Sequence, residues 1–150
     1  VLRVPAEQLP RTAERFFEEW KGQAKEIERL KEELARARLR SLAAEAEESD
    51  GLKIVVQRMG KADIDELLKA AALLVEQDCT VLLGSETGKL VAAVGRSGLE
   101  KGLKAGAIIK AAAKLLGGGG GGRPELAQGG GPNAERLEEA LAAGREVMRA

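Results

Sequence analysis

The chain has 150 residues, of which 44% are apolar and 2% aromatic, and its 24 basic residues equal its 24 acidic residues. This length predicts about one domain with a core of Leu, Val, Ile and Ala, and the balanced charge identifies no partner. The absence of histidine and the single cysteine, Cys79, exclude a disulfide framework and nearly exclude a zinc site. We therefore expect a module that binds or assembles and does not catalyse.

Residues 10–48 are expected to form one long helix with an apolar heptad seam. Its positions follow one another at steps of four and three: Phe16, Trp20, Gln23, Ile27, Leu30, Leu34 and Ala37. A seam of roughly 35 Å needs an equally long partner, and the later helices are about half as long. A second copy of the chain is the simplest partner; a helix lying across its own globular part is the alternative.

This interpretation predicts a helical subdomain over 1–51 that serves dimerisation. The polar Gln23 would help to fix the register of the pair. The candidate dimerisation residues are Phe16, Trp20, Ile27, Leu30 and Leu34.

From residue 52 onward the pattern changes to short strands and helices. Strands are expected at 52–59, 79–84 and 89–95, and helices at 62–77, 103–116 and from Asn133 to the end. Asp63 with Glu66 three residues later is a capping box, and Cys79 is expected to be a small buried residue. The segment GSETGK is too short for a phosphate-binding P-loop and is predicted to be a hairpin turn. Residues 52–150 are therefore expected to form a small globular α/β or α+β layer structure.

The segment KLLGGGGGGRPELAQGGGPNAERL at 114–137 is unusually rich in glycine. A flexible linker is the simplest interpretation. However, the nineteen residues after Gly131 form only one expected helix, which must return to the same core. We therefore expect an ordered glycine-rich loop, whose bare backbone N–H groups can hold anions such as phosphate.

Basic residues lead into this loop. Between positions 96 and 123, six basic residues stand against Glu100 alone: Arg96, Lys101, Lys104, Lys110, Lys114 and Arg123. A neutral chain thus carries a local charge of +5 there, which is typical of contact with a phosphate backbone. The region has no aromatic residue for base stacking, so a folded, double-helical surface fits better than a single strand.

The segment GGGGGGRPELAQGGG resembles the signature of the C-terminal domain of alanyl-tRNA synthetases, which is related to the accessory domain of DHH phosphoesterases. The segment RVPAEQLPRTAERFFEEWKGQAKEIERL resembles the helical start of that region in archaeal-type enzymes. The resemblance implies a parent enzyme that attaches alanine to tRNA using ATP and Mg, with catalytic and zinc-containing editing domains upstream. It also implies that this region dimerises and contacts the outer corner of tRNA.

Together these observations predict a noncatalytic, dimerising and tRNA-binding segment, without cofactor or metal of its own, cut from a longer chain because it does not begin with Met. No apolar run reaches the roughly 18 residues of a membrane span and no signal peptide is visible, so we expect a cytoplasmic protein. The candidate tRNA-binding residues are Lys101, Lys104, Lys110, Lys114, Gly118, Gly119, Gly120, Gly121, Gly122, Arg123 and Gln128. The alternatives are a purely structural oligomerisation module and a substrate-gripping accessory domain of a phosphoesterase.

Overall fold

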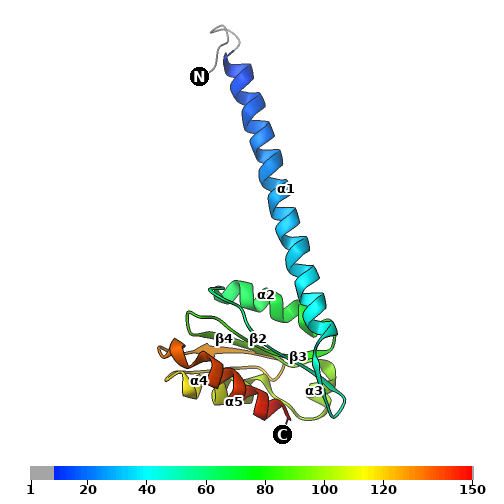
Figure 1. The fold of residues 1–150 in the computed structure, drawn as a ribbon, viewed down its shortest axis with the longest axis vertical. Helices are drawn as coiled ribbons and strands as arrows, with labels where there is room; N and C mark the ends of the chain where they lie inside the picture. Colours follow the sequence, from blue (N-terminus) through cyan, green and yellow to red (C-terminus); the bar gives the residue numbers. More distant parts are fainter. Residues whose placement is uncertain (1–8, 150) are drawn as a thin grey trace. The chain divides into compact units, whose positions relative to one another are not determined.

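The computed structural model describes residues 9–149, and side chains from residue 12 onward (Figure 1). The long helix α1 spans Leu9–Ala44. The chain divides into two compact units with the boundary between Arg38 and Leu39. The last part of α1, from Leu39, therefore belongs to the globular unit, where Leu39 is buried.

The prediction that the first helix continues to residue 48 is wrong. After Ala44 the chain forms a short strand, β1 (Glu47–Ser49), which pairs antiparallel with β2 (Leu52–Arg58). The connecting residues Asp50 and Gly51 both have positive φ, at 51° and 78°. Two such residues match the right-handed twist of a tight hairpin, so sheet pairing prevails over the helix propensity of the glutamates.

The globular unit is built on a sheet of six strands in the order β1-β2-β3-β4-β6-β5. The remaining strands are β3 (Cys79–Gly84), β4 (Lys89–Ala93), β5 (Gly119–Gly122) and β6 (Leu126–Gly130). Among the described strands only β2 and β3 pair in parallel, and α2 (Ile64–Val75) forms the crossover between them. The two edges of the sheet are therefore β1 and β5.

Helices cover both faces of this sheet (Figure 1). On one face, α2 packs on alternate residues of β3, including Val81 and Leu83. On the other face, α4 (Ala105–Leu115) and α5 (Leu137–Arg149) pack on residues such as Leu82 and Leu90. A one-turn helix α3 (Arg96–Glu100) precedes α4, and a 3₁₀ turn (Ala134–Arg136) precedes α5. The mixed α+β class predicted for the globular part is confirmed.

Several local predictions are also confirmed. The predicted hairpin is formed by β3 and β4 around residues 85–88, so GSETGK is a turn and no P-loop. The Asp63 carboxylate caps α2 by accepting a hydrogen bond from the backbone N–H of Glu66 at 2.8 Å. Cys79 is fully buried, and burial raises the pKa of its thiol. Helix α3 was not predicted, because its five residues are too few to show an apolar period.

Asp78 joins the start of β3 to α3. Its backbone has a left-handed φ of 57°, and its carboxylate accepts hydrogen bonds from the backbone N–H of Ser97 at 2.9 Å and from the Ser97 hydroxyl. The two bonds from Ser97, side chain first, lower the pKa of this carboxyl. Both bonds favour the ionised form, and the backbone bond satisfies a free N–H group in the first turn of α3.

We predict that Asp78→Asn lowers the free energy of unfolding at pH 7 by about 1 kcal/mol, because hydrogen bonds to a charged acceptor are stronger than those to a neutral one by about that amount. The pKa of this group is lower in the folded state than the usual aspartate value of about 4. Its contribution is therefore complete above about pH 4 and is lost as the pH falls through the folded-state pKa. Urea unfolding followed by circular dichroism should show the difference from wild type at pH 7 and little difference near pH 2. An equal difference at both values would contradict the assignment.

Candidate nucleic-acid interface

The glycine-rich segment is a β-hairpin at the edge of the sheet. The predicted ordered loop is not confirmed, because the segment forms two strands, β5 and β6, in antiparallel register from Gly119↔Gly130 to Gly122↔Ala127. The turn is closed by Arg123, whose N–H donates to the Leu126 carbonyl at 2.9 Å. A strand made of glycine has no side-chain alternation, so no sequence period could reveal it.

One face of this hairpin lies directly against α4. A Cβ built on Gly120 would stand 2.4 Å from the Gln128 carbonyl oxygen and 2.8 Å from Cγ2 of Ile109. The paired Gly129 would meet the same Ile109 methyl at 2.7 Å. Gly122 is equally crowded, with the Leu126 carbonyl oxygen at 2.5 Å. Glycine is therefore required at these positions for packing.

The opposite face of the hairpin is open. A Cβ built on Gly119 or on Gly121 has no atom within 4 Å, and neither residue has a positive φ. Gly121 is paired with Gln128, which is exposed and stands opposite Val91 on the α2 side of the sheet. Because α2 contacts chiefly β3 and β4, no helix covers β5 and β6 on the α2 side of the sheet. The fold gives no reason for glycine at 119 and 121.

The outer edge of β5 also presents backbone groups. Arg123 and Leu126 exchange both of their hydrogen bonds, and hydrogen-bonded pairs alternate along an antiparallel ladder. The N–H and C=O groups of Gly120 and Gly122 therefore point away from β6. Both residues are exposed, and the N and O atoms of Gly122 lie 3.9 and 3.7 Å from a Cβ built on Gly106 of α4.

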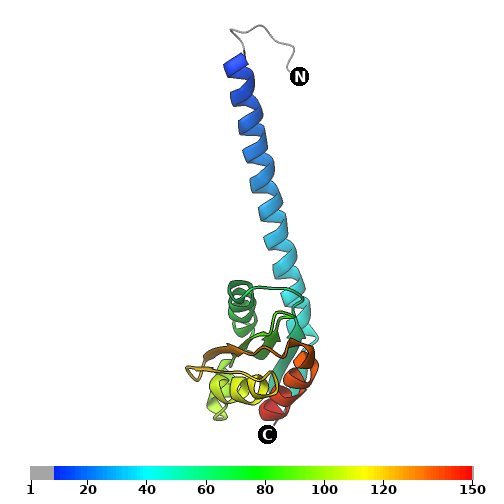
Figure 2. The ribbon, with the colours of Figure 1, turned by 90° about the vertical axis from the view of Figure 1, so that its left-hand side faces the viewer.

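Helix α4, which carries the predicted Lys110 and Lys114, lies beside this hairpin (Figure 2). Lys110 and Lys114 directly follow Ile109 and Ala113, through which α4 meets the hairpin: Ile109 lies under Gly120, and the Ala113 carbonyl accepts from the Gly118 N–H at 3.0 Å. Both lysines are exposed. Neither forms an ion pair within the described residues.

Lys104 and Arg123 lie near the hairpin turn, whereas Lys101 does not. Lys104 caps the start of α4, where the next N–H donates to the Pro124 carbonyl at 2.8 Å. Arg123 is exposed and pairs with Glu125 of the turn at 3.3 Å. The Lys101 ammonium lies beside Gly51, 3.9 Å from a Cβ built there. Gly51 belongs to the turn at the β1 edge, so the structure does not bring this lysine to the hairpin.

One basic residue of the open face was missed from the sequence. Lys89 pairs with Gly130, which in turn pairs with Gly119, so all three share one face. Its side chain is exposed. The alternation of Lys89 with the buried Leu90 could have indicated an outward side chain, but its neighbour β6 was not recognised as a strand.

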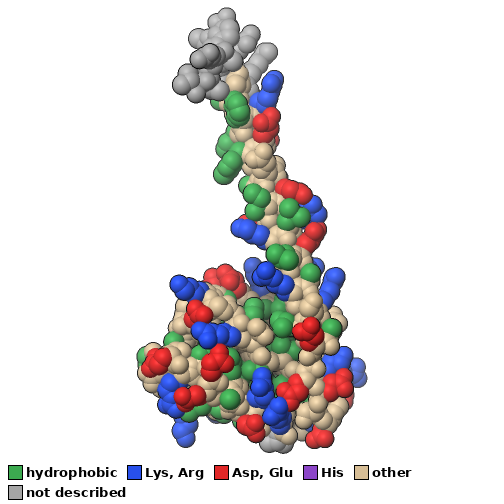
Figure 3. Space-filling view, viewed as in Figure 1, with side chains coloured by type: hydrophobic (Ala, Val, Ile, Leu, Met, Phe, Trp, Pro, Cys, Tyr) green, Lys and Arg blue, Asp and Glu red, His purple; other side chains and the backbone are tan. Residues whose placement is uncertain are grey.

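The predicted dimerisation residues form an exposed apolar surface on α1. Phe16, Trp20, Ile27, Leu30 and Leu34 are 50–64% exposed, and Phe17, which was missed, is 53% exposed. Figure 3 shows hydrophobic side chains along the surface of this helix. Phe17 stacks on Trp20 with 6.2 Å between the ring centroids, and the Lys21 ammonium lies 4.6 Å from the Phe17 ring centroid.

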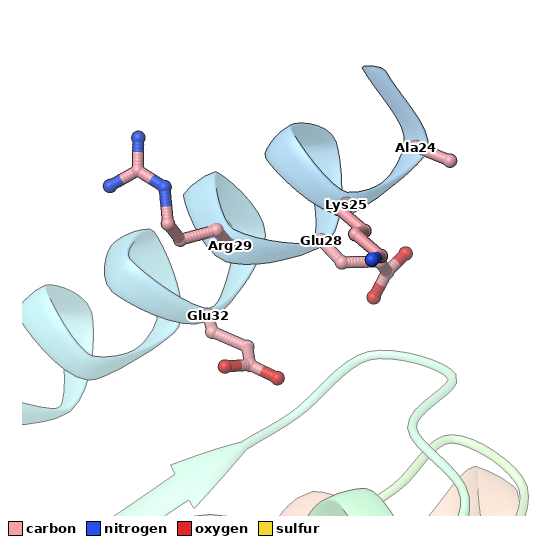
Figure 4. Close-up of a pocket in the computed structure, with 5 residues that line it drawn as sticks. All are labelled: Ala24, Lys25, Glu28, Arg29 and Glu32. Atoms are coloured by element: carbon pink, nitrogen blue, oxygen red, sulfur yellow. The ribbon is translucent and has the colours of Figure 1, made fainter. Parts of the chain in front are cut away.

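The described residues contain neither a candidate metal site nor a deep pocket on α1. The hollow in Figure 4 is lined by α1 residues alone: Ala24, Lys25, Glu28, Arg29 and Glu32. It is a shallow space between side chains of one helix. Within residues 9–149, no group of three Cys, Asp or Glu side chains could hold a metal ion, and no helix is long and apolar enough to cross a membrane.

The globular unit is a mixed sheet with helices on both faces and a glycine hairpin at one edge. Comparisons with known proteins identify the class of domain to which it belongs. Residues 51–150 match the DHHA1 domain, so the chain belongs to this family. The C-Ala domain from Aquifex aeolicus alanyl-tRNA synthetase is similar in structure, with a TM-score of 0.63 and 26% identity over 70% of this chain and 98% of that domain. RecJ from Thermus thermophilus shares the fold, with a TM-score of 0.54 and 18% identity over 86% of this chain and 20% of that one.

Curated relatives extend the similarity over nearly the whole chain. Alanine--tRNA ligase from Methanothrix thermoacetophila is 56% identical over 99% of this chain, and that from Methanosarcina barkeri is 46% identical over 99%. The chain spans only 17% and 16% of the length of these two relatives. The resemblance to the C-terminal domain of alanyl-tRNA synthetases is confirmed.

We predict opposite effects on stability for alternate glycines of β5. Gly119→Ala and Gly121→Ala should leave the free energy of unfolding unchanged or raise it by up to about 0.5–1 kcal/mol, because alanine restricts the unfolded chain and meets no atom. Gly120→Ala should lower it by about 1–3 kcal/mol, because its methyl group meets backbone and Ile109. Thermal unfolding followed by circular dichroism measures both. Equal destabilisation by all three substitutions would contradict the assignment of faces.

Proposed function

We propose that this chain is the tRNA-binding and dimerising C-terminal part of an alanine–tRNA ligase. The full enzyme would attach alanine to tRNA in the cytoplasm using ATP and Mg, with its catalytic and zinc-containing editing domains preceding this part. The similarity to relatives of that name and to nearly all of the C-Ala domain supports this proposal. The part described here would hold tRNA and a second copy, and would leave the chemistry to the preceding domains.

The observation that carries tRNA binding is the pair of glycines with no role in packing. Glycine in a strand lowers stability by roughly 0.5–1 kcal/mol relative to alanine, and a Cβ at 119 or 121 would meet no atom within 4 Å. A ligand that presses on this face accounts for their absence. The flat backbone could then be approached directly by a broad, rigid surface such as the outer corner of tRNA, which is read by shape.

The groups around the bare face suit phosphate. Lys89 lies on that face, and Lys110 and Lys114 are exposed residues of α4, the helix that packs against β5. The N–H groups of Gly120 and Gly122 point outward from the edge strand β5. Lysines and backbone N–H groups bind phosphate oxygens without reading base sequence, so this surface would recognise the shape and backbone of tRNA.

The exposed seam on α1 supports dimerisation. Its apolar side chains are half or more exposed although they recur at heptad spacing over several turns. A contiguous apolar surface of this kind marks an interaction site in soluble proteins. A second copy of α1 supplies a partner of equal length. The alternative of a purely structural assembly module predicts the same dimer without any affinity for tRNA.

We predict that Gly119→Val with Gly121→Val weakens tRNA binding at least about tenfold. The valines suit a strand but would hold the ligand away from the backbone. Filter binding or fluorescence anisotropy with labelled tRNA measures the effect. Gly22→Val is the control, because it adds the same side chain to another open glycine, on α1. Unchanged affinity in the double variant would remove the hairpin face from the proposal.

A second variant probes the flanking charges in the same assay. Replacing Lys110 and Lys114 by Gln should reduce the slope of log affinity against log salt by about two, because two phosphates would no longer be neutralised by a lysine. Lys61 and Lys69, which are also exposed, provide a matched pair of Gln substitutions that should leave the slope unchanged. No measurable affinity of the wild type for tRNA would leave the assembly module as the function.

We predict that Ile27→Asp converts the chain from a dimer to a monomer. The aspartate would place an unpaired charge in the middle of the seam, which is costly once it is buried. Sedimentation equilibrium measures the change. Lys25→Asp introduces the same residue outside the seam and should leave the dimer intact. A wild-type monomer at micromolar concentration would contradict dimerisation through α1.

A further inference from the structure

Gln128 places its side chain on the open face of the hairpin, on the α2 side of the sheet. It is paired with Gly121 of β5 on one side and with Val91 of β4 on the other. Gly121 has no side chain and Val91 is fully buried, whereas Gln128 is exposed. Within residues 9–149, no hydrogen bond involves the Gln128 side-chain amide. This amide is therefore free to bind a ligand that approaches the open face.

We propose that the Gln128 amide reads the edge of one nucleobase in a loop of the bound RNA, so that contact with the hairpin depends on base identity. This inference rests on the proposed tRNA binding and adds a base-specific contact to it. The base would present a hydrogen-bond donor and an acceptor side by side, as N6 and N7 of adenine do, and a glutamine amide pairs with such an edge through two hydrogen bonds. An edge with two acceptors, such as O6 and N7 of guanine, would place an acceptor against the amide oxygen.

The cationic and N–H groups around this face cannot make that distinction. The Lys89 ammonium and the outward N–H groups of β5 only donate hydrogen bonds, so they suit phosphate oxygens in any sequence. The side-chain amide of Gln128 both donates and accepts. Base identity is encoded in the order of donors and acceptors along a base edge. Among the side chains that the strand register places on this face, Gln128 is therefore the one equipped to read it.

Gly121 leaves room for a base beside this amide. Residues paired across two antiparallel strands have Cβ positions about 4.5–5.5 Å apart. A side chain at 121 would therefore stand directly beside the Gln128 side chain and occupy the space that a base edge needs. A Cβ built on Gly121 meets no atom within 4 Å, so packing does not account for the missing side chain. Access of a base to Gln128 does account for it.

The composition of the globular unit favours recognition through the base edge. From Leu39 onward the chain contains no Phe, Tyr or Trp, so no ring is present there on which a base could stack. Hydrogen bonds to the edge then remain as the way to select a base. Base edges are accessible in loops, whereas the major groove of an A-form RNA helix is too deep and narrow for side chains to read. A loop at the outer corner of tRNA meets both conditions.

The first test removes the amide and keeps the length of the side chain. Gln128→Met should raise the dissociation constant for an alanine-accepting tRNA about tenfold in fluorescence anisotropy, the loss expected for one bidentate base contact. The slope of log affinity against log salt should stay unchanged, because no phosphate loses a cation. Gln77→Met is the matched control, because Gln77 is also exposed but lies between α2 and β3, outside the sheet. Equal affinity of the Gln128→Met chain and the wild type would overturn the proposal.

The second test asks whether the contact reads a base. Chemical footprinting of the tRNA with the wild type and with the Gln128→Met chain identifies the loop base whose protection depends on the amide. Replacing that base should weaken binding of the wild type about tenfold and leave binding of the Gln128→Met chain almost unchanged, which is the coupling that a double-mutant cycle measures. An equal loss for both chains, or no such protected base, would show that Gln128 does not read a base and would overturn the proposal.

These outcomes also separate the proposal from the function on which it rests. If Gly119→Val with Gly121→Val weakens tRNA binding but Gln128→Met does not, binding at the hairpin stands and base reading by Gln128 is overturned. A wild-type chain without affinity for tRNA overturns both.

Discussion

The close contact between α4 and the backbone of the β5–β6 hairpin determines the character of this domain. The Ile109 side chain is fully buried and meets the hairpin where Gly120 and Gly129 face each other. No Cβ fits there, so the edge of the sheet approaches the helix more closely than side chains would allow. The resulting sheet end is supported on one face by a helix and is exposed on the other. A rigid surface without side chains follows from this packing.

This arrangement separates two roles of glycine that the sequence presents as one run. Gly120 and Gly122 are glycine because the fold requires it, and Gly119 and Gly121 are not. Substituting Gly120 or Gly122 would test packing and would not test ligand binding. The distinction depends on strand alternation, since successive residues of a strand face opposite sides of the sheet.

Much of the fold could be predicted from local patterns. The apolar runs of β2, β3 and β4, the Asp63 cap and the final helix were all recognisable, because each has a side-chain period or a capping residue. β1 was missed because its two glutamates suit a helix, and β5 and β6 were missed because glycine shows no period. The candidate lysines could be selected by charge, but only strand register places Lys89 on the open face and the Gly51 contact places Lys101 elsewhere. The apolar seam residues of α1 are exposed in a single copy of the chain, and their pairing stays a prediction.

The aromatic residues of the chain are Phe16, Phe17 and Trp20, and all of them lie on α1. The globular unit from Leu39 onward therefore contains no aromatic side chain. Intrinsic tryptophan fluorescence arises from Trp20 alone, and it reports on the surroundings of one helix. Its emission should shift when that side chain leaves water, while melting of the sheet and its helices passes without a fluorescence signal of its own.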